Sequence, residues 1–289
     1  MHQAIRAMSF GEMLDTGFRI LRDRFGLMLA LTAVGYLPLG LLMSAAAGPG
    51  QALPGPGRVL VSVGAVLVYS LLALPVVMAA TIHVAGSWLL GRETTLRASL
   101  ALGLSIYLPM VGTFFLLYLV LLGLGGAVLV AAATGMLAPV LGVVLGLLAA
   151  GGAVWVFVGL LIVPQLVVLE RGFGLHPLRR SWELLQGHRL RALGVLGVVG
   201  VVTMVLQGAL VLPTLPFPRL SPIAQYLGQG LGQALSMAVT CAFYVDLRCR
   251  REGFDLEHLA AQVAGRDDGA GRRDPVAGPS GDGSGRSVV

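Results

Sequence analysis

Residues 104–133 read LSIYLPMVGTFFLLYLVLLGLGGAVLVAAA, a stretch without a single charged side chain. A helix needs about 20 consecutive apolar residues to cross the hydrocarbon core of a bilayer. Five further apolar stretches without Asp, Glu, Lys or Arg flank it on both sides. The sequence therefore predicts an all-α integral membrane protein with six transmembrane helices, at about 27–47, 59–90, 104–133, 136–169, 192–212 and 223–245.

The composition of the whole chain agrees with this fold class. Of 289 residues, 56% are hydrophobic and 12% are charged, whereas an ordinary soluble domain contains about 25% charged residues. The mean hydropathy is +0.85. These values exclude a soluble enzyme.

The positions of the arginines predict the orientation. The chain contains no lysine, and 18 of its 20 arginines precede the first span, follow the last, or lie in the even-numbered connections 92–97 and 171–191. Arg58 and Arg219 fall on the other side. Because cytoplasmic loops carry the excess of basic residues, both termini are expected in the cytoplasm. Acidic residues before the first span argue against a cleaved signal peptide.

The chain divides into a six-span membrane domain, residues 1–264, and a tail, residues 265–289. The tail is rich in glycine and has too few apolar side chains to fold, so we expect it to be disordered and cytoplasmic.

A short pattern recurs before each span that runs outward. Its small residue is Gly17, Ser99 and Ser181, at intervals of 82 residues. The spacing indicates three possible repeat units, each an amphipathic cytoplasmic helix followed by a helical hairpin. Ser9 and Glu12 form a capping-box pattern at the start of the first such helix. These helices either pack against the bundle or provide a site for lipid or a partner.

Two cytoplasmic segments form a candidate surface for lipid or a protein partner. Arginine side chains beside a membrane suit the phosphate groups of lipid headgroups, and alternating charges after the last span could pair with them. The candidate residues are Arg171, Arg179, Arg180, Trp182, Arg189, Arg191, Asp246, Arg248 and Arg250. We expect membrane lipids as partners, and no nucleic acid.

The last span carries a polar face. Gln225, Gln229 and Gln233 repeat every four residues beside a row of small residues that includes Ser236 and Thr240. Such a face either packs closely against another helix or lines a polar cavity.

Catalytic and metal-binding patterns do not appear. His83 has no acidic neighbour in its span, so a hydrogen bond to a neighbouring helix is the favoured interpretation. Cys241 and Cys249 have no metal-ligand spacing to a histidine. We therefore expect no catalytic residue, no metal and no cofactor.

Three motifs are similar to those of a known bacterial group: FGEMLDTGF at 10–18, LRRSWEL at 178–184 and YVDLRCRREGFDLE at 244–257. With the matching topology they resemble the family named for the membrane domain of glycerophosphoryl diester phosphodiesterase. The resemblance implies an inner-membrane location. In members named for the enzyme, the chemistry belongs to a separate soluble barrel, so the resemblance implies no enzymatic activity here.

These observations lead to two hypotheses of function. The first is a non-catalytic membrane module that organises a partner protein or binds lipid at the cytoplasmic face. The alternative is a transporter or permease for a lipid-like or small neutral solute, which would use the polar face of the last span. The sequence does not predict the oligomeric state.

Overall fold

The computed structural model describes residues 6–46, 56–217 and 219–253, and in these ranges all regular structure is helical, with no strand. The elements, in chain order, are α1 (Phe10–Asp23), α2 (Phe25–Ala46), α3 (Pro56–Leu89), α4 (Leu96–Ser105), α5 (Tyr107–Leu137), α6 (Pro139–Gly159), α7 (Val163–Leu169), α8 (Leu175–Leu185), α9 (Arg189–Val211), the 3-10 turn η1 (Leu212–Thr214) and α10 (Leu220–Glu252). The predicted tail, 265–289, lies outside the described residues.

The predicted fold class is confirmed. Within the described ranges, six segments are long and apolar enough to cross a membrane: Phe25–Ala45, Gly64–Leu89, Tyr107–Met136, Pro139–Leu169, Arg189–Thr214 and Leu220–Glu252. The chain is therefore a multi-pass integral membrane protein. The last helix extends beyond the predicted boundary at residue 245 and ends where Gly253 adopts a left-handed conformation, with φ of 64°.

The structure differs from the predicted spans at two places, the hairpin turn between the third and fourth spans and a break within the fourth. The hairpin between the third and fourth spans turns at Ala138, and Thr134 and Gly135 remain helical. Pro139 begins the next helix and restricts the residue before it, which explains this position. The fourth span is not one continuous helix, because it breaks after Gly159 and resumes just before Pro164.

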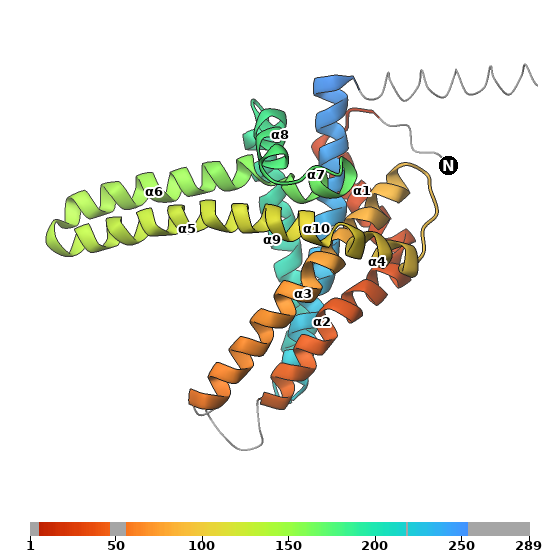
Figure 1. Cartoon of the computed structure of the whole chain (residues 1–289), viewed down its shortest axis with the longest axis horizontal. Coiled ribbons are helices and arrows are strands. Elements are labelled where there is room, and N and C mark those ends of the chain that lie inside the picture. Colours follow the sequence, from red (N-terminus) through yellow and green to blue (C-terminus); the bar gives the residue numbers. More distant parts are fainter. Residues whose placement is uncertain (1–5, 47–55, 218, 254–289) are drawn as a thin grey trace, which may run out of the picture.

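Helix α10 lies at the centre of a bundle with α2, α3 and α9 (Figure 1). Small residues permit close contact. A Cβ atom added at Gly230 would lie 2.5 Å from Thr32 of α2, and one added at Gly232 would lie 2.2 Å from Thr203 of α9. These glycines therefore account for the tight packing around α10.

The hairpin of α5 and α6 projects sideways from this bundle (Figure 1). Its two helices pack mainly against each other, and almost none of α5 is buried. Its exposed surface is apolar, as expected for helices surrounded by lipid.

Three short helices, α1, α4 and α8, occupy the predicted amphipathic positions, and each places the recurring small residue against a neighbour. Gly17 lies against Val239 of α10. Ser99 of α4 bonds to His83 of α3, with 3.2 Å between Oγ and Nδ1. Ser181 of α8 donates to a carbonyl of α6, 2.9 Å away. Helices α4 and α8 thus contact the second helix of the hairpin that precedes them, and α1 contacts the second helix of the last hairpin, α10.

Candidate functional site

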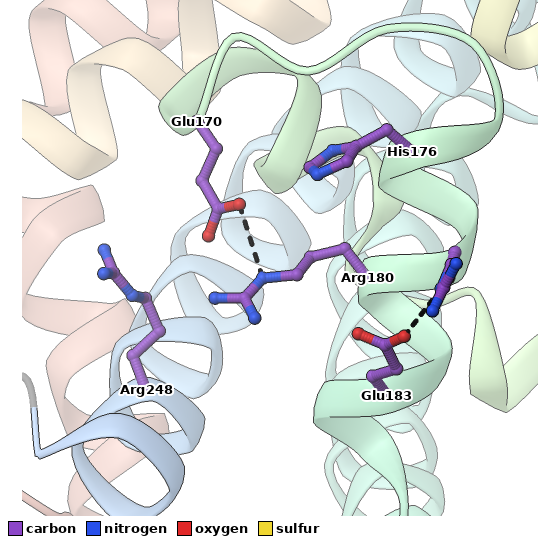
Figure 2. Close-up of a pocket in the computed structure, with 6 residues that line it drawn as sticks. Glu170, His176, Arg180, Glu183 and Arg248 are labelled. Carbon is purple, nitrogen blue, oxygen red and sulfur yellow. Dashed lines mark hydrogen bonds and ion pairs between the residues drawn. The ribbon is translucent and has the colours of Figure 1, made fainter.

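A polar pocket of about 510 Å³ lies where α8 meets the loop after α7 and the last turns of α10 (Figure 2). We call this part of the molecule, with the nearby α1, the arginine-rich end. The side chains that line the pocket are Glu170, His176, Arg179, Arg180, Glu183 and Arg248. Three of the predicted surface arginines, at 179, 180 and 248, therefore come together here.

The loop between α7 and α8 shapes one wall of the pocket. Arg171 has φ of 53°, which side chains other than glycine rarely adopt, and its side chain is exposed outside the pocket. Gly174 has φ of 68° and donates its N–H to Thr113 of α5, with 3.2 Å between nitrogen and Oγ1. The loop is thus tied to α5, and Glu170 at its start points into the pocket.

Carboxylates hold two of the pocket arginines in place. The Nε of Arg180 lies 3.5 Å from Glu170, and its guanidinium also pairs with Glu252. Arg248 donates to Glu252 over 2.9 Å. The hydroxyl of Tyr244 donates to Glu170 over 2.8 Å. This network links α8 to α10 across the pocket, as the alternating charges predict.

Arg179 is the most accessible arginine of the pocket. Among the described residues it pairs only with Glu183, one turn away on α8, over 2.8 Å, and its side chain is 85% exposed. The hydrogen bond to Glu183 raises the pKa of Arg179 above its usual range, so the cation persists at every physiological pH. Arginines of this kind suit a carboxylate or phosphate group.

Three residues of the predicted surface form a separate cluster around one buried carboxylate. The carboxylate of Asp246 is fully buried and accepts the Met8 N–H over 2.7 Å. Arg250 lies 3.0 Å and Arg191 lies 3.4 Å from this carboxylate, and both also donate to the Met8 carbonyl. These side chains fasten the segment before α1 to α10, so they are not part of an open binding surface.

Trp182 and Arg189 form a third group. The Arg189 guanidinium lies over the indoles of Trp182 and Trp155, with its Cζ 3.8 Å and 4.2 Å from their ring centres. This contact joins α6, α8 and α9. The single candidate surface of the sequence prediction is therefore divided into three sites.

The predicted polar face of α10 is also divided. Gln225 and Gln229 are exposed and Gln233 is half-buried, and these amides have no hydrogen-bond partner within the described part of the chain. In the adjacent row of small residues, Gly228 and Gly232 pack against α9. Ser236 is half-buried, and its carbonyl accepts a hydrogen bond from the buried Thr240.

One buried polar residue was missed by the sequence analysis. Gln165 of α7 is completely buried and donates to Thr240 over 2.6 Å, while its Oε1 has no partner. A lone amide directly after Pro164, inside an apolar span, was the available signal. Among the described residues, no group of three His, Cys, Asp or Glu side chains could hold a metal ion.

Comparison with known proteins gives a family but no characterised relative. Neither a curated protein nor a solved structure matches this chain. A family model matches residues 8–247, which include the first five candidate transmembrane segments of the described residues, most of the sixth, and every pocket-lining residue except Arg248. The chain therefore belongs to the family described as Domain of unknown function (DUF7847).

Proposed function

We propose that this protein is a non-catalytic membrane module that holds a partner protein through the pocket at its arginine-rich end. The observation that carries the proposal is the arrangement of three arginines around one polar cavity. Arg180 and Arg248 are held by carboxylates, and Arg179 extends outward. An acidic side chain of a partner fits this charge and geometry.

The distribution of the arginines supports a cytoplasmic position for the pocket. Eighteen of the twenty lie on one side of the spans, which favours a cytoplasmic location of both termini. On this basis the partner is a cytoplasmic protein or the cytoplasmic part of a membrane protein.

The sequence resemblance supports the same kind of role. The motifs at 10–18, 178–184 and 244–257 resemble the bacterial family named for the membrane domain of glycerophosphoryl diester phosphodiesterase. In members that carry the enzyme, the membrane domain accompanies a separate catalytic barrel. We therefore infer an inner-membrane protein that assembles with another protein and performs no chemistry itself.

Mass spectrometry of the protein, purified gently in native-lipid particles, tests this proposal. We expect a stoichiometric protein partner to co-purify with the wild type and to be lost from Arg179→Gln. Arg179 is the appropriate position because, within the part of the chain that the structure describes, its replacement breaks one exposed ion pair, which contributes little stability.

Arg19→Gln is the matched control, because Arg19 also forms an exposed ion pair one turn away, with Asp15 at 2.7 Å, but lies outside the pocket. The partner should remain bound to this variant. Retention of the partner by Arg179→Gln, or its loss from both variants, would contradict a role of the pocket. Enrichment of one lipid with no protein would assign the pocket to lipid binding instead.

A second function, passage of a lipid-like or small neutral solute, is supported by the glutamine face of α10. Gln225 and Gln229 expose amide groups that form no hydrogen bond with the described residues, and unpaired amides are unfavourable against lipid. Uptake into vesicles tests this alternative. A solute path predicts that Gln229→Leu abolishes uptake while the protein remains folded, and equal uptake by the variant would refute it.

A further inference from the structure

Arg189 and two tryptophans form a compact group at the junction of α6, α8 and α9, separate from the pocket. The guanidinium carbon of Arg189 lies over the rings of both Trp182 and Trp155, and the residue is only 8% exposed. Gly159 makes room for this arrangement, since a Cβ atom there would lie 2.7 Å from the Trp182 ring.

The two ring contacts do not use the hydrogen-bonding capacity of the guanidinium. The five N–H donors of arginine point outward in the plane of the group, not toward its faces. Within the described residues, Arg189 has no hydrogen bond and no ion pair, and its Nη1 is buried without a partner. A buried cation without an acceptor is unfavourable, so this group favours an anionic ligand.

The start of α9 favours an anion at the same place. Arg189 is the first residue of this helix, and no side chain caps its first turn. The free backbone N–H groups and the helix dipole attract negative charge. The other arginine of this turn, Arg191, pairs with Asp246 and so belongs to the separate cluster around that carboxylate.

We propose that Arg189 binds the phosphate group of an anionic phospholipid. Two apolar side chains beside it are open to the surroundings, since Trp155 is 55% and Leu190 is 83% exposed. They provide contacts for acyl chains, which inorganic phosphate lacks. Tryptophan and arginine are also the side chains that meet headgroups at the membrane interface. This lipid site is distinct from the partner pocket of the proposed function.

Native mass spectrometry of the full-length protein, released from bilayers of phosphatidylcholine and phosphatidylglycerol, tests the proposal. We expect the wild type to retain phosphatidylglycerol. Arg189→Gln should retain about tenfold less of this lipid, because a charge-assisted hydrogen bond is lost. Arg22→Gln is the control, since Arg22 is an 80% exposed arginine of the same end. It should retain the lipid as the wild type does.

Equal retention by folded Arg189→Gln and wild type would overturn the proposal. Displacement of the lipid by excess inorganic phosphate would identify a site for the free anion and would also overturn it.

A second measurement leaves Arg189 unchanged. In the Trp88→Phe background, the two remaining tryptophans of the chain are Trp155 and Trp182. Brominated phosphatidylglycerol should quench their fluorescence more strongly than brominated phosphatidylcholine. Equal quenching by the two lipids would show that no anionic lipid is preferred, and would refute the site even if Arg189→Gln does not fold.

Discussion

Replacing Asp246 with alanine should lower the free energy of unfolding by about 3 kcal/mol, because removal of one partner from a buried ion pair leaves uncompensated charge. The carboxylate is fully buried and accepts from Met8 at 2.7 Å and from Arg250 at 3.0 Å, with Arg191 at 3.4 Å. The arginine side chains are 35% and 22% exposed, so water partly compensates them and the effect lies at the lower end of the range for buried pairs.

Asparagine at the same position separates geometry from charge. Asp246→Asn keeps an acceptor for the Met8 N–H and fills the same space, so we expect a smaller loss of about 1–2 kcal/mol. Asp15→Ala removes the carboxylate of an exposed pair in α1, 2.7 Å from Arg19, and should cost about 0.5 kcal/mol or less.

Unfolding in mixed micelles, titrated with a denaturing detergent and followed by tryptophan fluorescence, measures all three variants against the wild type. The reasoning would be refuted if Asp246→Ala cost no more than Asp15→Ala, because the buried cluster would then contribute nothing beyond an exposed pair.

Three further predictions concern local structure. The N–H of Ser9 and the Arg6 guanidinium lower the pKa of Glu12 from 4.5 to about 2. The stabilisation of α1 by ionised Glu12 should therefore be complete above pH 4.5 and decline as the pH falls through about 2. Hydrogen exchange of α1 should show this pH dependence in the wild type and lose it in Glu12→Gln. Gly17→Ala should cost about 1–3 kcal/mol, because its Cβ would lie 2.3 Å from Val239 and 3.1 Å from that residue's backbone, whereas Gly11→Ala, with nothing within 4 Å, should be neutral or stabilising in the same unfolding titration. Arg171→Gly should change stability by less than about 1 kcal/mol, since relief of left-handed strain offsets the added chain entropy, and a large loss in thermal unfolding would show that the Arg171 side chain stabilises the loop.

The helices could be predicted from the sequence because the bilayer imposes one requirement on each span, a sufficient length of apolar side chains. The exact turns depended on local chemistry. Pro139 moved the hairpin turn to Ala138, and Pro164 accompanied a break in the fourth span. Both prolines were visible in the sequence, but hydropathy does not distinguish a turn from a helix that continues.

The candidate site was predictable in its residues but not in its grouping. Arg179 and Arg180 of the basic segment at 171–191 line the pocket. The arginines at 180, 189 and 191 nevertheless face three different neighbours. The direction of a side chain depends on which helices pack beside it, and one sequence does not reveal that packing. The buried amide of Gln165 was missed for the same reason, because its partner Thr240 lies 75 positions away.

The contact of α1 with α10 has a consequence for biosynthesis. The chain is synthesised from its N-terminus. Gly17 nevertheless packs against Val239, and the Met8 N–H donates to Asp246, and both of these partners lie in the last helix, α10. The face of α1 that packs on α10 is therefore uncovered until α10 has been synthesised. A nascent chain arrested before α10 would lack this contact. Chains with and without α10 would therefore differ in the exposure of the α1 packing face.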